Sequence, residues 1–273
     1  MRRHLIVLCL LLAACTPTRD SASTDTQNTN LGGVPVTVNA VLDGDSVRVT
    51  MDGSPVEVRL LGINAPERDE CWADAARTSL NESLSVGAIS LVGSEQDRYG
   101  RLLAYLYSDG TNVNRNQIIV GSALAIASDH EELPDFLAAE EEALALERGL
   151  WNPSASGTSP VTQVSIWAFE PDAEGRDDRN PNGEYVAITN EGPAADLTDW
   201  TIHDESSVHR FTFPERFVLE TGDIIVIRSG CGDDDDANLY WCADGPVWTN
   251  SGDTVLLLDP TGNVVDRLRY FGD

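Results

Sequence analysis

The sequence predicts a mainly β protein with two domains: a five-stranded barrel of the OB type with three helices, followed by a β-sandwich. Short apolar runs separated by Gly, Asp and Pro turns fill most of the chain, and helical periodicity appears only in the first half. The length of 273 residues suits two domains of ordinary size, each able to bury a core of its own.

Residues 1–15 have the layout of an export signal. Two arginines precede an apolar run, Leu5 to Leu12, that is short for a membrane span, and small residues then lead to Cys15. The ending LAAC resembles the lipobox of bacterial lipoproteins, which implies cleavage before Cys15 and a lipid on its thiol. An ordinary signal peptide cut nearby is the alternative. Residues 16–33 are rich in Ser, Thr, Asn and Asp, so we expect a flexible tether there.

Residues 34–151 carry the barrel pattern. The predicted strands are VTVNAVL at 36–42, SVRVTM at 46–51, VEVRLLGI at 56–63, AISLVG at 88–93 and RLLAYLY at 101–107. Helical spacing predicts one helix within 71–84 and two more within 112–125 and 133–151. Five short strands with an inserted helix fit a small Greek-key barrel.

Residues 152–162 form the predicted linker, and residues 163–273 form the predicted sandwich. Apolar strands with turns at regular spacing continue through this second segment without a long helix, which is typical of a β-sandwich.

Cysteine usage agrees with export. Cys231 and Cys242 form a close pair that is a plausible disulfide in an oxidising compartment, and Cys71 is expected to be a half-buried thiol. The loop between the pair contains Asp233 to Asp236, for which we expect a solvated loop, with calcium binding as the alternative.

The charge balance is strongly acidic. The chain has no lysine, so its 18 basic residues are all arginine against 45 Asp and Glu, for a net charge of -27. Such a balance argues against broad electrostatic capture of nucleic acid, which normally needs a basic face.

Three short motifs carry candidate chemistry. In DGDS, Asp43 and Asp45 can face a hard cation, although a hairpin turn explains the isolated motif equally simply. In VRLLGINAPE, one strand and its turn present Arg59, Asn64 and Glu67. In DRYGRLLAYLY, Arg98, Tyr99 and Arg101 surround a glycine turn.

A metal ion, a base and two arginines suffice for phosphodiester hydrolysis. Arginine forks match phosphate oxygens and can stabilise the charge of the transition state, and a carboxylate can take a proton from the attacking water. Arg59 could instead pair with an acid for structural reasons, and Arg101 could cap the barrel.

These motifs and ERGLW occur in the order and spacing seen in the thermonuclease, or staphylococcal nuclease-like, family, and the match covers about residues 36–151. The resemblance implies an OB-fold, Ca2+-dependent nuclease that acts on DNA and RNA and leaves 3′-phosphates. It implies that Arg59 and Arg101 grip phosphate and that Glu67 is the general base. It also implies that Asp45 is a calcium ligand and that Tyr99 hydrogen-bonds the substrate phosphate.

The sequence departs from that family in two ways. Asn64 stands where well-studied members carry an aspartate ligand, so one negative charge is lost and we expect weaker calcium binding. The basic surface is also missing, so we expect weaker binding of nucleic acid.

The second segment resembles the lamin-tail domain over about residues 163–270. The stretches that carry this resemblance are NPNGEYVAITNEGPAADLTDWTIHD, FVLETGDIIVIRSG and WTNSGDTVLLLDPTGNVVDRLRY. This resemblance implies an immunoglobulin-like sandwich and leaves its ligand unknown. Trp200 and Trp248 are expected in the core or at an edge. We expect His130, His203 and His209 at the surface or hydrogen-bonded in turns, and the acidic helix around Glu140 to be solvated.

Together these observations predict an exported nuclease, lipid-anchored on the cell envelope or extracellular. The alternative is a catalytically weak or inactive OB-fold module that binds nucleic acid or protein at the cell surface. The sequence leaves the oligomeric state open.

Overall fold

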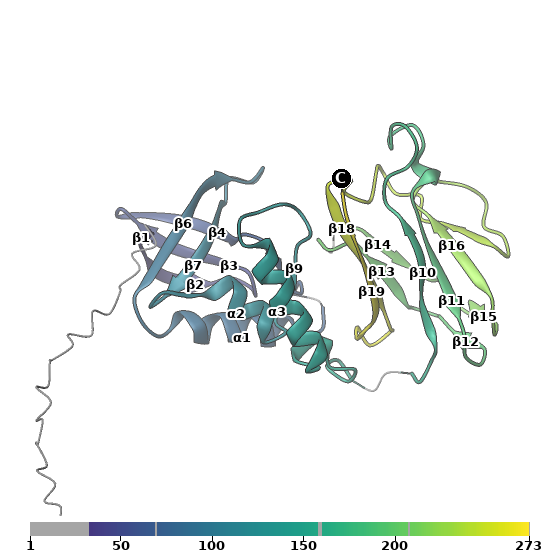
Figure 1. Ribbon diagram of the computed structural model, residues 1–273, viewed down its shortest axis with the longest axis horizontal. Helices are drawn as coiled ribbons and strands as arrows, with labels where there is room; N and C mark the ends of the chain where they lie inside the picture. Colours follow the sequence, from purple (N-terminus) through teal and green to yellow (C-terminus); the bar gives the residue numbers. More distant parts are fainter. Residues whose placement is uncertain (1–32, 69, 158–159, 207, 273) are drawn as a thin grey trace, which may run out of the picture. The chain divides into compact units, whose positions relative to one another are not determined.

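Alternating apolar residues in the first half of the chain form a seven-stranded sheet (Figure 1), whose order is β1-β6-β7-β4-β3-β2, with β8 paired to β7. The strands are β1 (Val34–Pro35), β2 (Thr37–Val41), β3 (Ser46–Met51), β4 (Ser54–Leu60), β6 (Ile89–Gln96), β7 (Leu102–Ser108) and β8 (Thr111–Asn112). A separate pair joins β5 (Ile63–Asn64) to β9 (Leu124–Ala125). All five predicted strands are present; β1, β5, β8 and β9 are two residues each, too short for a periodic signal.

The computed structural model describes residues 33–68, 70–157, 160–206 and 208–272. The predicted signal, the lipidated Cys15 and almost all of the tether lie outside the described residues. Within the described ranges, no helix has the length and apolar character that crossing a membrane requires.

Three helices cover the barrel strands: α1 (Ala73–Leu84), α2 (Val113–Ile119) and α3 (Leu133–Ala145), followed by a 3-10 turn η1 (Gly149–Trp151). Both neighbouring pairs, α1 with α2 and α2 with α3, are in contact (Figure 1). The Asn112 side chain accepts a hydrogen bond from the Arg115 amide and caps α2. This helix is shorter than expected because Gly121, at φ +72°, turns the chain against the Arg148 carbonyl, where a Cβ would lie 2.0 Å from the oxygen.

The barrel core joins inward-facing strand residues to one side of each helix. Its fully buried members include Val47, Val49, Val58, Leu60, Leu91, Ala104, Leu106, Ala76, Leu80, Ile118 and Phe136. In β3 every second residue points inward, as the period of a strand requires.

The second half forms two four-stranded sheets, ordered β10-β11-β16-β17 and β14-β13-β18-β19, and a small pair, β12-β15. The strands are β10 (Val164–Glu170), β11 (Tyr185–Asn190), β12 (Ala195–Asp196), β13 (Thr201–His203), β14 (Arg210–Thr212), β15 (Val218–Leu219), β16 (Ile224–Arg228), β17 (Asn238–Tyr240), β18 (Gly252–Leu258) and β19 (Val264–Phe271), with a 3-10 turn η2 (Pro181–Gly183). Inner residues of both sheets share one core around the fully buried Trp200. Two sheets sharing one core make a β-sandwich.

The described residues from 33 to 272 belong to one compact unit, and a third apolar cluster is shared by the barrel and the sandwich. It contains Leu124, Ala143, Leu150 and Trp151 from the barrel and Leu256 from β18. The two halves are therefore held together by an apolar contact as well as by polar bonds.

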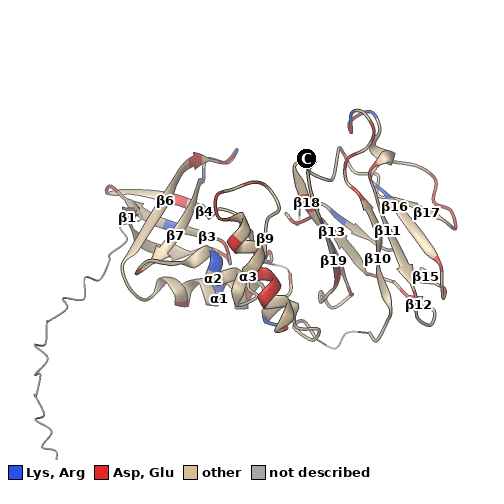
Figure 2. Cartoon of the chain, in the orientation of Figure 1, with Lys and Arg blue, Asp and Glu red and all other residues tan. Residues whose placement is uncertain are grey.

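Buried charges accompany this apolar contact. Glu140 of α3 is fully buried and pairs with Arg269 at 2.7 Å and Arg267 at 3.2 Å, both in β19. The expectation that the acidic helix is simply solvated is therefore wrong at Glu140, because two sandwich arginines compensate its charge. In Figure 2, Asp and Glu mark part of α3 and loops of both halves.

The expectation that the histidines lie at the surface or are hydrogen-bonded in turns is wrong for His203. His203 is 4% exposed in β13, where burial and the nearby Arg210 lower its pKa to about 4. His130 is hydrogen-bonded to the Tyr105 hydroxyl, and His209 to Asp204.

A second buried carboxyl lies where the sandwich meets the barrel. Both carboxylate oxygens of Glu205 accept from the Ala127 amide, at 3.0 and 3.1 Å, and Thr254 donates to one of them at 3.0 Å. Burial and the neighbouring Asp253 raise the pKa of Glu205 to about 8.

This raised pKa predicts a loss of stability as pH rises. The unfolded chain releases the Glu205 proton near its ordinary pKa, whereas the folded chain keeps it until about pH 8, so the free energy of unfolding falls across that interval. One pKa unit corresponds to about 1.4 kcal/mol, so a pKa raised from 4.5 to about 8 should lower the free energy of unfolding by roughly 3 kcal/mol between pH 5 and pH 8, and we expect Glu205→Gln to remove this change. Urea unfolding at pH 5 and pH 8 measures it, with exposed Glu220→Gln as the control. An equal change in the free energy of unfolding between pH 5 and pH 8 in wild type and in Glu205→Gln would contradict the assignment.

Candidate active site

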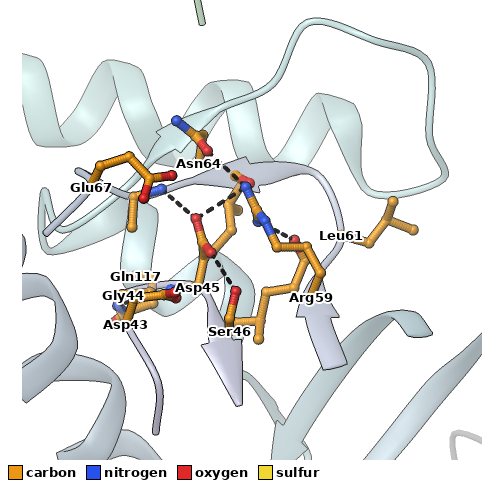
Figure 3. Close-up of polar contacts among 12 residues, drawn as sticks. Asp43, Gly44, Asp45, Ser46, Arg59, Leu61, Asn64, Glu67 and Gln117 are labelled. Carbon is orange, nitrogen blue, oxygen red and sulfur yellow. Dashed lines mark hydrogen bonds and ion pairs between the residues drawn. The ribbon is translucent and has the colours of Figure 1, made fainter. Parts of the chain in front are cut away.

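The turn between β2 and β3 buries the carboxylate of Asp45 (Figure 3). Its Oδ2 accepts from the Ala65 amide at 2.7 Å and lies 3.0 Å from Arg59 Nη2, while its Oδ1 accepts from the Ser46 hydroxyl at 3.0 Å. Burial raises the pKa of Asp45 to about 6, with Arg59 acting in the opposite direction. The carboxylate thus accepts hydrogen bonds on both oxygens and has the Arg59 guanidinium beside it.

Two features hold this turn close to the helices. Gly44 packs so tightly that a Cβ there would lie 2.5 Å from the Ala65 Cβ and 2.7 Å from the Ala76 Cβ. The fully buried Gln117 of α2 donates to the carbonyls of Gly44, at 2.9 Å, and Ala76. Gln117 is thus a supporting residue that the sequence reasoning missed, because a single glutamine on a helix carries no signal of its partner.

Arg59 lies near the end of β4 with its side chain 14% exposed. Its Nη1 donates to the carbonyls of Leu60 at 2.9 Å and Ile63 at 2.7 Å, and its Nη2 donates to Asn64 Oδ1 at 2.7 Å. The guanidinium therefore joins Asp45 and Asn64, the two residues expected to bind calcium.

The chain leaves this cluster through the turn after β5. Asn64 is 5% exposed, whereas Glu67, three residues later, is exposed. Figure 3 shows the Glu67 side chain beside this cluster. A buried amide oxygen and an exposed carboxylate thus lie on one short loop.

The second arginine occupies a separate hairpin turn. Asp97 Oδ2 accepts from Arg101 Nε at 2.7 Å, and its Oδ1 accepts from the amides of Tyr99 and Arg101. Burial raises the pKa of Asp97, but the hydrogen bonds from Arg101 and Tyr99 outweigh it and hold that pKa below its ordinary value. Tyr99 is 68% exposed, and the Arg101 guanidinium carbon lies 5.5 Å from its ring centre.

The sheet brings these two arginines to neighbouring strands. β4 and β7 run parallel, with Arg59 opposite Leu103, and Arg101 directly precedes β7. The sequence could not show this pairing, because the two strands are separated by α1 and β6.

The donor set suits a hard cation. Asp43 and Asp45 offer carboxylate oxygens and Asn64 an amide oxygen, and Ca2+ prefers six to eight oxygens from carboxylates, amides and water. Among the described residues, no group of three or more His, Cys, Asp or Glu side chains is placed to hold a metal ion. The residues therefore fit a cation site that substrate and water would have to complete.

Comparisons with known proteins indicate one family for the first half of the chain. The model of the staphylococcal nuclease homologues matches residues 57–153, and an uncharacterized endonuclease of Escherichia coli O157:H7 is 33% identical over 114 residues, covering 41% of this chain and 73% of the relative. The chain belongs to the family of staphylococcal nuclease homologues.

Other relatives of this nuclease homologue also carry endonuclease names. In Bacillus subtilis, the SPbeta prophage-derived endonuclease YokF is 32% identical over 132 residues, covering 44% of each chain. Endonuclease YncB of the same species is 30% identical over 139 residues, covering 46% of this chain and 65% of the relative. The Lamin Tail Domain model matches residues 157–272. The predicted fold class, an OB-fold domain followed by an immunoglobulin-like lamin-tail domain, is confirmed.

The remaining candidate residues lie in or near the lamin-tail domain. The nuclease homologue has a disulfide between Cys231 and Cys242, and Cys71 is a half-buried free thiol. Asp233 to Asp236 are exposed, and Asp234 and Asp235 accept hydrogen bonds from backbone amides of their own loop. Trp200 and Trp248 are buried in the sandwich core.

The Asp45 cluster predicts a large stability effect. Asp45→Ala removes the acceptor of the Ala65 amide and leaves the largely buried Arg59 without its carboxylate, so the free energy of unfolding should fall by about 3 kcal/mol. Urea unfolding measures the change, with exposed Asp129→Ala as the control, for which a loss below about 1 kcal/mol is expected. Equal losses in the two variants would show that Asp45 does not anchor the loop.

Proposed function

We propose that this nuclease homologue hydrolyses phosphodiester bonds of DNA and RNA, depends on Ca2+ and leaves 3′-phosphates. The observation that carries the proposal is the Asp45–Arg59–Asn64 cluster, with the exposed Glu67 three residues beyond Asn64 on the same loop. The endonuclease names of its relatives support the same reaction class.

In this proposal, Asp45 and Asn64 hold the calcium ion. When bound, Ca2+ contributes positive charge that polarises a phosphate oxygen. Arg59 already pairs with both oxygen donors, so a bound cation would share them and free guanidinium N–H groups for phosphate.

The chain's own residues supply the remaining steps. The exposed Glu67 carboxylate takes a proton from the attacking water as the water oxygen bonds to phosphorus; the bond from phosphorus to the 5′-oxygen breaks, and that oxygen takes a proton from solvent. Arg59 and Arg101 donate to phosphate oxygens as negative charge develops, and Tyr99, exposed at its hairpin turn, hydrogen-bonds the substrate phosphate.

We also propose that the protein is exported and anchored to the cell envelope through a lipid on Cys15, or released outside the cell. The supporting observation is the signal-like sequence ending at Cys15. The lamin-tail domain would then bind a ligand at that surface.

A binding module without catalysis is the second candidate function. The observation that favours it is that both Arg59 and Arg101 pair with carboxylates of their own chain, Asp45 and Asp97. A net charge of -27 also repels a polyanion, so such a module would bind a protein more readily than nucleic acid. Activity distinguishes the two functions, because a binding module leaves the substrate intact.

Digestion of single-stranded DNA by the full chain, with calcium titrated into the millimolar range, tests the nuclease. We expect cleavage that requires calcium and leaves 3′-phosphate ends, and a kcat lowered at least about 100-fold in Glu67→Gln and Arg59→Ala. Glu57→Gln and Arg48→Ala are the matched controls, since these residues pair with each other at the surface. A folded protein that cuts at no calcium concentration would favour the binding module.

The amide at position 64 predicts weak calcium binding. Asn64→Asp adds one negative charge to the cation site and should lower the calcium concentration for half-maximal cleavage by about tenfold. Calcium titration of activity measures the shift, and Asn81→Asp, the same change at an exposed position of α1, controls for net charge. An unchanged midpoint in Asn64→Asp would mean that Asn64 is not a calcium ligand.

A further inference from the structure

The turn that carries Glu67 is closed by Glu70. The Glu70 amide donates to the Glu67 carbonyl at 2.8 Å, and Glu70 Oε2 accepts from the Glu67 amide at 2.8 Å. Both main-chain polar groups of Glu67 are thus held by one residue. The position of the Glu67 backbone therefore depends on where the Glu70 side chain is fixed.

The other oxygen of Glu70 is bound by the lamin-tail domain. Arg210 Nη2 of β14 donates to Glu70 Oε1, whose side chain is only 13% exposed. His203, opposite Arg210 in the strand register, places its Nδ1 3.7 Å from the same oxygen. Because burial and Arg210 lower the pKa of His203 to about 4, this ring is neutral at pH 7, and Arg210 supplies the positive charge.

Packing alone does not fix this turn. A cavity of about 250 Å³ lies against it, lined by Asn64, Pro66 and Glu70 from the nuclease-homologue domain and by His203 and Arg210 from the lamin-tail domain. Along the cavity this turn meets open space in place of close-packed side chains, so its polar bonds contribute to holding it.

We propose that Arg210 is a positioning residue for the catalytic turn: by binding Glu70, the lamin-tail domain holds Glu67 in place beside the Asp45–Arg59–Asn64 cluster. This inference rests on the proposed nuclease function, in which Glu67 is the base. It assigns the lamin-tail domain a direct part in activity, apart from any ligand that the domain binds.

The charge and the hydrogen bond at Glu70 can be separated by substitution. Glu70→Gln keeps an oxygen that can accept from the Glu67 amide and removes the ion pair with Arg210. Arg210→Met removes the charge from the other side and keeps a long side chain, whereas Arg210→Lys retains the charge. Arg176→Met is the matched control, because Arg176 is an exposed lamin-tail arginine paired with Asp178.

The test measures calcium-dependent cleavage of single-stranded DNA by the full chain, together with amide hydrogen exchange of residues 64–71. We expect Arg210→Met and Glu70→Gln each to lower kcat about tenfold with KM unchanged, because Glu67 does not bind substrate in the ground state. The double variant should lose no more than either single variant, since both break the same pair. Exchange in the turn should be faster in both, and Arg210→Lys should recover part of each effect.

Two results would overturn the inference. One is wild-type kcat and wild-type turn protection in a folded Glu70→Gln variant; the other is a raised KM at unchanged kcat in Arg210→Met, which would make Arg210 a substrate contact. If Arg210→Met does not fold, Glu70→Gln carries the test. If the wild type cleaves nothing, the proposed function fails by itself, and hydrogen exchange alone then decides whether Arg210 positions the turn.

Discussion

A carboxylate removed from water needs donors on its oxygens and a nearby positive charge, and Asp45 has both. The Ala65 amide, the Ser46 hydroxyl and the Arg59 guanidinium surround it, so the β2–β3 turn, the end of β4 and the loop after β5 meet at one side chain. The loop carrying Asn64 and Glu67 starts from this contact. The geometry of the candidate site therefore depends on the ion pair between Asp45 and Arg59. The same residues that stabilise the fold are thus the ones expected to meet a cation.

The chain has no lysine, so every basic side chain is an arginine, and acids outnumber arginines 45 to 18. Arginines near the site and between the domains are bound to the chain's own acids: Arg59 to Asp45, Arg101 to Asp97, and Arg269 to Glu140. A nucleic acid phosphate would have to compete with these carboxylates for the same N–H groups. In the proposed mechanism, a divalent cation would change that competition, because it would neutralise the acids and release arginine donors.

The contact between the two domains combines apolar burial with buried charge. Leu256 of the lamin-tail domain packs against Leu150 and Trp151, while Glu140 and Glu205 place carboxyl groups in the same region. Buried acids make such a contact sensitive to pH and intolerant of losing one partner. The lamin-tail domain is therefore bound to the nuclease-homologue domain by specific side chains rather than joined only by a linker.

The sequence by itself determined the domain order, the five main strands, the three helices and the motifs around Asp45, Arg59, Glu67 and Arg101, because strand alternation, helical spacing and motif order are local properties. Tertiary structure decided which of these side chains meet. Pairing of β4 with β7 across the intervening α1 and β6 brought the two arginines to adjacent strands. Gln117 under the Asp45 turn, Arg269 against Glu140 and Arg210 against Glu70 join positions far apart in the chain. No local pattern encodes such contacts, since an isolated Gln, Glu or Arg has the same sequence signal whether its partner is water or a buried charge.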